Sequence, residues 1–308
     1  MSVMERMLAL ALLCAAAPVA AQVTPAPVEE APATGEDLSF LIADTRMTVP
    51  VEIAGAGPYR FVIDTGAQRS VISRQLARRL GLPAGRRVRL TAMSGTSDVD
   101  TVIVPSLSVS TLGGARIEAP ALEAQHLGAP GILGIDTLQG HALLIDFDRQ
   151  QMRVSPAGRR PPRRERDEIV IEARSLFGQL VVTNATVAGR RVRVVLDTGA
   201  SVSMGNLALR KLLRQRGKPG DTVVFTSVLG QNVTADYAII GEMTLGSATI
   251  RSMPVAFADA APFRAFGLDD KPALFLGMDA LSLFRRVNID FANRELRLVL
   301  PRDARFAG

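Results

Sequence analysis

Cysteine, tryptophan and histidine are nearly absent from this sequence of 308 residues, which has one cysteine, no tryptophan and two histidines. The histidines, His126 and His141, lie outside any cluster with the spacing of metal ligands, so we expect no metal site. No G-x-S-x-G segment is present to supply the nucleophile of a serine hydrolase. The shortage of these residues leaves carboxylate chemistry as the main option, and it predicts no cofactor.

The single cysteine, Cys14, lies in an N-terminal segment unlike the rest of the chain. Residues 1–21 carry one early arginine, continue as LALALLCAAAPVA and end on small residues before Gln22. This pattern is typical of a secretory signal peptide, and its apolar run is too short to span a bilayer. We expect cleavage after residue 21 and export to the periplasm or the medium. The mature chain then has no cysteine, which excludes disulfides and cysteine protease chemistry.

No later stretch is apolar and long enough for a membrane-spanning helix, so no integral membrane segment is expected after cleavage. The formal net charge is +6, and part of the excess falls in SPAGRRPPRRERDE, residues 155–168. Arginine, proline and glycine dominate this segment, which predicts a solvated linker. With two tyrosines and no basic stripe interleaved with aromatic residues, nucleic acid is not an expected partner.

The stretches on either side of this linker repeat each other. The first contains MTVPVEIAGAGPYRFVIDTGA, residues 47–67, and the second contains LVVTNATVAGRRVRVVLDTGA, residues 180–200. Each predicts a β-hairpin with an Ala-Gly turn and a buried return strand. A short helix is expected after each, with Ser73 as the N-cap and Gly81 as the stop in the first, and Asn206 and Gly217 in the second.

Further features recur in the same order in both halves. A strand and turn region follows each helix, and each half then contains an apolar-apolar-Gly-x-Asp segment, ILGID at 132–136 and FLGMD at 275–279. The series indicates duplication of a β-rich unit of roughly 120 residues. The expected organisation is a signal peptide (1–21), a disordered spacer (22–37), a first unit (38–154), the linker (155–168), a second unit (169–302) and a tail (303–308).

From about residue 38 to 301, the chain resembles the retropepsin-like aspartic proteases. The features that carry the resemblance are the doubled Asp-Thr-Gly-Ala segment, the strand before it, the helix after it and the later Leu-Gly element. The resemblance implies an all-β, bilobal acid-protease fold of two tandem retropepsin-like β-barrel units with short helices. It also implies a monomer that works as an internal pseudo-dimer, as in bacterial exported aspartyl proteases with two such units.

The resemblance implies that Asp64 and Asp197 are the catalytic residues. Two carboxyl groups in close proximity cannot both ionise cheaply, so one keeps its proton while the other stays a base. The base deprotonates a shared water and the acid polarises the scissile carbonyl, without a metal or a covalent intermediate.

The other residues of the two segments are expected to support the catalytic loops. The glycines allow close approach of the backbone, the alanines are small enough to pack at the junction, and the family's threonines hydrogen-bond to the opposite loop. For Asp136 and Asp279 we expect helix capping and packing rather than catalysis. The supporting residues are Thr65, Gly66, Ala67, Thr198, Gly199 and Ala200.

The family also covers its active site with a hairpin flap. Glycine tolerates the positive φ of a hairpin turn, so Gly95 and Gly230 are the candidate tips. The two tip sequences diverge, and we therefore expect an asymmetric cleft with a single working flap. The candidate flap residues are Ser94, Gly95, Thr96, Leu229, Gly230 and Gln231.

Together these features predict an exported aspartic endopeptidase that holds an extended peptide or protein and processes an envelope or periplasmic protein. Two alternatives stay open: a catalytically silent peptide-binding or scaffold protein with the same fold, and pairing of each unit with its counterpart on another chain. The linker spans roughly 45 Å when extended, which is long enough for pairing within one chain.

Overall fold

The computed structural model describes residues 37–39, 41–43, 46–109, 112–157, 167–213 and 222–301. The expected signal peptide, nearly all of the spacer, the centre of the linker, Gly217 and the tail lie outside these ranges. The described residues belong to one compact unit that begins at residue 35. No helix in the described part of the chain combines the length and the apolar character needed to cross a membrane.

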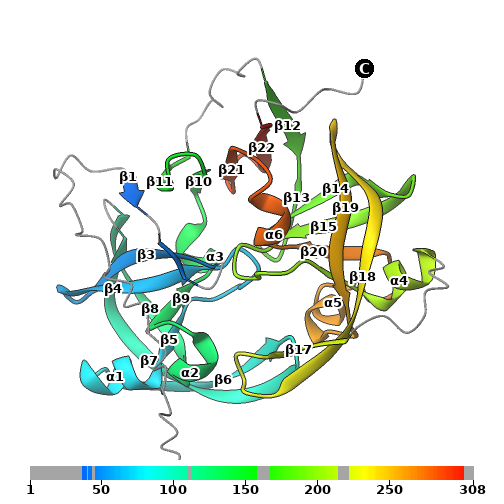
Figure 1. Cartoon of the computed structure of the whole chain (residues 1–308). Helices are drawn as coiled ribbons and strands as arrows, with labels where there is room; N and C mark the ends of the chain where they lie inside the picture. The colour runs from blue at the N-terminus through cyan, green and yellow to red at the C-terminus, as the bar shows by residue number, and fades with distance from the viewer. Residues whose placement is uncertain are drawn as a thin grey trace, which may run out of the picture. The chain divides into compact units, whose positions relative to one another are not determined.

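The first half of the chain builds an eight-stranded sheet in the order β2-β3-β4-β9-β5-β8-β7-β6, with a further pairing of β3 with β7 (Figure 1). Three short helices accompany it. The elements are β2 (Leu41–Ala43), β3 (Arg46–Ile53), β4 (Ala56–Ile63), β5 (Val71–Ser73), α1 (Arg74–Arg79), β6 (Ala84–Ala92), β7 (Gly95–Val109), β8 (Leu112–Leu122), α2 (Ala124–Leu127), β9 (Gly131–Leu133) and α3 (Ile135–Leu138).

The second half builds a matching sheet in the order β13-β14-β15-β20-β16-β19-β18-β17, with a further pairing of β14 with β18. Each strand has a counterpart at the same place in the first sheet, so the fold repeats as the sequence does. The expected all-β fold of two tandem units is confirmed. The elements are β13 (Arg174–Leu176), β14 (Gln179–Val187), β15 (Arg190–Leu196), β16 (Met204–Gly205), α4 (Leu207–Leu213), β17 (Thr222–Thr226), β18 (Asn232–Leu245), β19 (Ala248–Phe257), α5 (Ala261–Ala265), β20 (Ala273–Leu276) and α6 (Met278–Leu281).

A third sheet takes strands from both halves. Its order is β1-β11-β10-β21-β22-β12, and β10 pairs with β21 in antiparallel register from Ala142 with Asp290 to Asp146 with Arg286. The strands are β1 (Asp37–Ser39), β10 (His141–Asp146), β11 (Gln151–Pro156), β12 (Glu168–Glu172), β21 (Arg286–Asp290) and β22 (Glu295–Val299). The residues at both ends of the expected linker, Ser155, Pro156 and Glu168, therefore belong to strands rather than to the linker.

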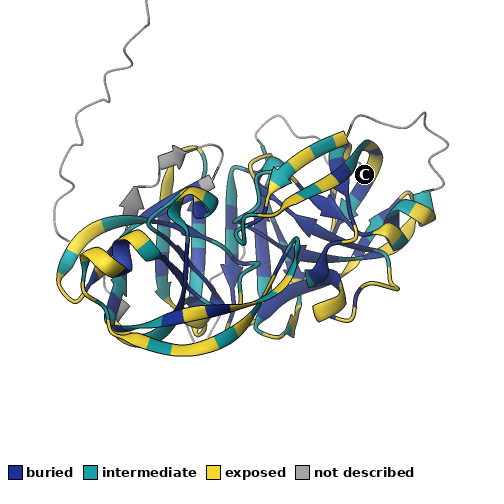
Figure 2. Cartoon of the chain, turned by 90° about the horizontal axis from the view of Figure 1, so that it is seen from below, coloured by how far each residue is buried: buried dark blue, intermediate teal, exposed yellow. Residues whose placement is uncertain are grey.

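The core follows from alternation along the strands. Met47, Val49, Val51 and Ile53 of β3 are all fully buried, and they alternate with residues that face the other side of the sheet. Figure 2 shows the same mixture of buried and exposed positions along the longest strands. One large buried cluster combines such residues from all three sheets, and it supports the loops that leave β4 and β15.

Both predicted helix caps are present. The Ser73 Oγ accepts a hydrogen bond from the Leu76 N–H at 3.1 Å and caps α1, and Gly81 lies just beyond the end of this helix. In the second half, the Asn206 Oδ1 accepts from the Leu209 N–H at 2.8 Å at the start of α4. These caps fix the point at which the chain leaves each Asp-Thr-Gly-Ala segment.

Candidate active site

The two Asp-Thr-Gly-Ala segments leave their sheets at equivalent points. Strands β4 and β15 run parallel to β9 and β20, respectively. The Asp64 N–H donates to the carbonyl of Leu133 at 2.9 Å, and the Asp197 N–H donates to the carbonyl of Leu276 at 3.0 Å. The buried strands therefore end each time on an aspartate whose backbone is held by a neighbouring parallel strand.

Two threonines interlock the loops. The Thr65 N–H donates to the Thr198 Oγ1, and the Thr198 N–H donates to the Thr65 Oγ1, both at 3.1 Å. Their hydroxyl groups also donate hydrogen bonds across the junction. The Thr65 hydroxyl donates to the carbonyl of Leu196 at 2.8 Å, and the Thr198 hydroxyl donates to the carbonyl of Ile63 at 2.9 Å. Both side chains are buried, so these four hydrogen bonds hold the loops face to face in a water-poor environment.

The carboxylates of Asp64 and Asp197 meet at this junction, and a side-chain hydrogen bond links them. Each also accepts two backbone N–H groups of its own loop at Oδ1. The donors are Gly66 and Ala67 for Asp64, at 2.8 and 2.9 Å, and Gly199 and Ala200 for Asp197, both at 3.1 Å.

Burial raises the pKa of Asp197 well above its usual range, and the neighbouring charge of Asp64 and the hydrogen bond to it raise this pKa further. The N–H groups of Gly199 and Ala200 act in the opposite direction, because they stabilise the ionised form. The effects that raise the pKa of Asp197 outweigh those that lower it. The pair therefore retains a proton at pH values where ordinary aspartates are ionised. That proton belongs to the pair rather than to one residue.

The glycines of the two segments stand against the aspartates of the opposite half. A Cβ atom at Gly66 would lie 2.8 Å from the Asp197 Cγ, and one at Gly199 would lie even closer to the Asp64 Cγ. No side chain fits at either position without displacing a carboxylate. The close approach of the two acids therefore requires glycine at both positions.

Asp136 and Asp279 act differently from the capping role expected for them. The helix α3 begins after Gly134 without a side-chain cap. Instead, Asp136 accepts hydrogen bonds from the Ser70 hydroxyl at 2.7 Å and the Ser70 N–H at 2.9 Å. Asp279 accepts equivalent bonds from Ser203, at 2.6 Å from the hydroxyl and 2.9 Å from the N–H.

These two serines were missed by the sequence analysis, although a signal existed. Each lies six residues after its aspartate, in DTGAQRS and DTGASVS. Each hydroxyl also accepts the N–H of the glycine that precedes the later short helix, Gly134 or Gly277, at 3.0 Å. Ser70 and Ser203 thus tie the Asp-Thr-Gly-Ala segments to the apolar-apolar-Gly segments.

The tips of the two predicted hairpins touch each other. The Ser94 hydroxyl, in the turn between β6 and β7, donates to the Gln231 Oε1 in the turn between β17 and β18 at 2.8 Å. Gly95 and Gly230 both have positive φ, +145° and +86°, as hairpin turns require. The Thr96 hydroxyl stays within its own hairpin, 3.0 Å from that of Thr91.

Each tip also packs on the opposite half. Met93 contacts the buried cluster around Phe263 in the second half, and Leu229 contacts the cluster around Leu127 in the first. A Cβ at Gly230 would lie 2.5 Å from the His126 Cε1, so this tip lies directly on α2. Both hairpins therefore reach across the junction, and the single working flap stays a prediction.

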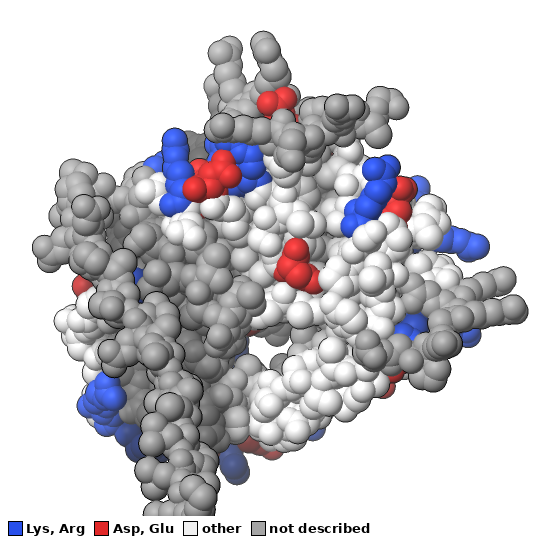
Figure 3. Space-filling model, in the orientation of Figure 1, with Lys and Arg blue, Asp and Glu red and all other residues white. Residues whose placement is uncertain are grey.

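An opening separates the hairpins from the loops. In the space-filling view it lies between the part of the molecule that carries the two interlocked loops and the part formed by the hairpins (Figure 3). The described residues that border it are mainly uncharged.

Gln179 is a third residue that the sequence analysis missed. Its side-chain amide, on β14, donates to the carbonyl oxygen of Gly66 at 2.8 Å, and its side chain is buried. The equivalent position in the first repeat is Arg46. Because the residue types differ, comparison of the repeats gives no signal for this contact.

In the part of the chain that the structure describes, no three histidine, cysteine or acidic side chains gather in a way that would hold a metal ion.

The sequence model of the aspartyl protease family matches residues 49–137 and again residues 183–280, together more than half of the chain. Each match contains one Asp-Thr-Gly-Ala segment. No curated protein matches the sequence. Among solved structures, the crystal structure of a retropepsin-like aspartic protease from Rickettsia conorii is similar, with 21% identity, coverage of 43% of this chain and 90% of that chain, and a TM-score of 0.31.

Proposed function

Because this chain belongs to the aspartyl protease family, we propose that it is an endopeptidase that hydrolyses peptide bonds with a water molecule held between Asp64 and Asp197. The observation that carries the proposal is the coupled carboxyl pair. Asp197 is buried, its pKa is raised, and it shares a hydrogen bond with Asp64. Such a pair holds one acid and one base at the same pH.

The proposed reaction needs only this pair. The ionised carboxylate takes a proton from water while the water oxygen attacks the carbonyl carbon, and the protonated carboxyl gives its proton to the carbonyl oxygen. The resulting tetrahedral diol then loses the amine: the nitrogen takes a proton from the carboxyl that received one, and the C–N bond breaks. A diol hydroxyl returns a proton to the other carboxylate, so the pair regains its single proton.

Preorganisation is the contribution of the surrounding residues. The threonine hydrogen bonds fix the distance between the loops, and the backbone N–H groups fix the orientation of each carboxylate. The reacting groups then need little rearrangement at the moment of reaction, which lowers the barrier.

The proposed substrate is an extended peptide or protein segment that lies between the loops and the two hairpins. Strand-like peptides gain affinity from main-chain hydrogen bonds, while pockets on alternate sides select side chains. Residues 1–21 carry the pattern of an export signal, so the proposed location is the periplasm or the medium and the proposed substrate is an envelope or periplasmic protein.

We also propose that one chain suffices. The threonine hydrogen bonds join loops of the same chain, and a tether between the two units keeps their effective concentration near the millimolar range. Light scattering of an active preparation tests this arrangement. A monomeric mass with full activity supports it, and activity confined to dimers contradicts it.

The test of the function is cleavage of an unfolded protein mixture by residues 22–308 from pH 3 to pH 8. Asp64→Asn and Asp197→Asn are expected to lose at least about 100-fold in rate, while Asp269→Asn, at an exposed position, keeps full activity. Circular dichroism establishes that all variants are folded. If the folded parent cleaves nothing but retains peptides, the chain is the silent peptide-binding protein of the alternative interpretation.

A further inference from the structure

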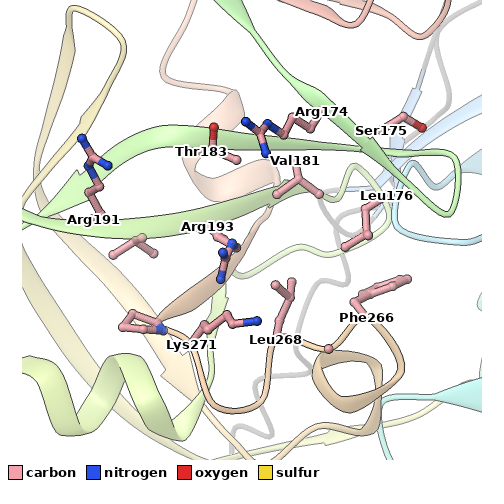
Figure 4. Close-up of a pocket in the computed structure, with 13 residues that line it drawn as sticks. Arg174, Ser175, Leu176, Val181, Thr183, Arg191, Arg193, Phe266, Leu268 and Lys271 are labelled. Carbon is pink, nitrogen blue, oxygen red and sulfur yellow. The ribbon is translucent and has the colours of Figure 1, made fainter.

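A cavity of about 590 Å³ lies in the second half, away from the carboxyl pair. It is open to solvent and is lined by β13, by β14 and β15, and by the segment from Phe266 to Pro272 that comes after α5 (Figure 4). Neither Asp-Thr-Gly-Ala segment and neither hairpin tip contributes to its lining. It is therefore separate from the site proposed for hydrolysis.

Basic side chains line this cavity without any acidic one. They are Arg174, Arg191, Arg193 and Lys271. Among the described residues, the guanidinium groups of the three arginines form no ion pair and no hydrogen bond. Lys271 has one weak partner, the exposed Asp270 at 3.9 Å. The arginines thus offer unused donors to an anion, and Arg is well shaped to bind carboxylates.

The two ends of the cavity differ in polarity. In Figure 4, Arg193 and Lys271 extend into the space between β15 and the segment after α5, and Arg191 lies at one end. Leu176 and Phe266 lie at the other end. A ligand that fills the cavity therefore needs an anionic part and an apolar part.

The size of the cavity favours a ligand larger than a simple inorganic ion. Its volume lies in the range of sites for organic molecules of drug size. A phosphate or sulfate ion leaves the apolar end unfilled. Leu176, which is only partly buried and lines this end, favours burial of an apolar side chain instead.

The neighbouring strand favours a polypeptide over a small organic anion. Strand β13 is the first strand in its sheet, and within the described residues only β14 pairs with it. All three residues of β13 line the cavity. A peptide added beside this edge gains main-chain hydrogen bonds and places alternate side chains over the cavity.

We propose that this cavity is a second peptide-binding site, which takes a stretch of acidic residues followed by apolar ones. The acidic side chains bind Arg193 and Lys271, and the apolar side chains lie against Leu176 and Phe266. This inference rests on the proposed function in one respect: the stretch belongs to a protein substrate and lies outside the segment that is cut. The cavity then selects substrates independently of the residues beside the scissile bond.

The test measures binding apart from cleavage. A fluorescein-labelled peptide in which two glutamates precede two leucines is titrated with the full Asp64→Asn chain, and anisotropy reports binding. We expect saturable binding that weakens as salt rises, and no binding of the same peptide with glutamines in place of glutamates. Equal binding of the two peptides overturns the proposal.

Variants locate the site. The double change Arg193→Ala with Lys271→Ala is expected to weaken binding at least tenfold, since each charge-assisted contact accounts for about that factor. Arg190→Ala, an exposed arginine on the same strand that does not line the cavity, leaves binding unchanged. If the double variant fails to fold, binding is measured with Arg174→Glu instead. This change at an exposed position reverses one charge of the lining without altering buried residues, and it is expected to weaken binding.

Cleavage separates this inference from the function on which it rests. For a substrate with the acidic stretch, the cavity variants raise KM and leave kcat unchanged. If the parent cleaves but neither binds the labelled peptide nor distinguishes the two substrates, this inference alone fails. If the parent binds the peptide but cleaves nothing, the proposed function fails while the binding site stands. Displacement of the peptide by low millimolar inorganic phosphate at constant ionic strength identifies a small-anion site and overturns the proposal.

Discussion

The side-chain amide of Gln179 donates a 2.8 Å hydrogen bond to the carbonyl oxygen of Gly66, so the second half of the chain holds the Asp64 loop of the first half directly. Both residues lie beside the carboxyl pair: Gln179 is buried, and a Cβ at Gly66 would meet the Asp197 carboxylate. This contact adds to the restraints that the threonine hydrogen bonds, the parallel strand and the Ser70 hydrogen bonds place on the Asp64 loop.

Replacing Gln179 with methionine keeps the volume but removes the donor. The Gly66 carbonyl then loses this partner, which lowers the free energy of unfolding by about 1–2 kcal/mol. A loop displaced by a fraction of an ångström lowers kcat at least about tenfold, while KM stays similar. Denaturant unfolding and steady-state kinetics measure the two effects. Gln151→Met, at an exposed position of β11, is the matched control, and equal behaviour of the two variants refutes the positioning role.

Gly199→Ala tests the close approach of the loops. The new Cβ collides with the Asp64 carboxylate, which is held by two backbone N–H groups and cannot turn away freely. Overpacking of this kind costs about 1–3 kcal/mol, and misplacement of the acid abolishes cleavage.

The control for this change is Gly241→Ala. A Cβ at Gly241 meets no atom within 4 Å, so the unfolding free energy is unchanged or raised by up to about 1 kcal/mol. Chemical denaturation and cleavage assays of both variants check the contrast. Full activity of Gly199→Ala contradicts the geometry proposed for the pair.

Asp197 makes the stability of the protein depend on pH. Its raised pKa means that the folded state keeps a proton that the unfolded chain releases near an ordinary aspartate pKa of about 3.9. The folded state binds more protons in that range, so stability falls as pH rises above about 4 towards the raised pKa of the folded state.

The variant Asp197→Asn has no titrating group at this position, so its stability does not fall for this reason as pH rises. It is expected to match the melting temperature of the parent near pH 3 and to exceed it increasingly as pH rises. Thermal unfolding from pH 3 to pH 8 measures the difference. A constant difference across this range shows that Asp197 does not titrate in the way its environment implies.

The repeat explains why so much of the fold could be predicted from the sequence. Alternating apolar residues at 47, 49, 51 and 53 set the strand, and the caps Ser73 and Asn206 set the start of the helix after each Asp-Thr-Gly-Ala segment. These are local signals with a fixed period, and each occurs twice. Two copies of one motif also indicated that Asp64 and Asp197 belong together.

Contacts between the halves could not be predicted in the same way. Gln179 has an arginine, Arg46, at the equivalent position of the first repeat, and the Ser94–Gln231 bond joins turns 137 residues apart whose sequences differ. The cavity likewise combines Arg193 of β15 with Lys271 from a distant segment. Such pairs depend on how two folded halves meet, which periodicity within one half does not specify.

Arg297 holds the sheet that both halves share. Its guanidinium is 5% exposed and binds Glu168 of β12 and Glu295 of β22, each at 3.0 Å. Removing the cation leaves two carboxylates in a poorly hydrated site, and breaking a buried pair in this way costs about 3–5 kcal/mol. Arg297→Met is therefore expected to lower the free energy of unfolding by that amount.

An exposed pair provides the comparison. Arg285 binds Asp148 at 2.7 Å, with side chains that are 27% and 47% exposed. Because water and salt screen such a pair, Arg285→Met should cost at most about 1 kcal/mol. Adding Glu168→Gln and Glu295→Gln to Arg297→Met removes the unpaired charges and should restore much of the lost stability. Urea unfolding of the parent and these three variants measures the differences in unfolding free energy. If the triple variant is no more stable than Arg297→Met, the lost stability comes from packing of the arginine stem and not from the unpaired charges.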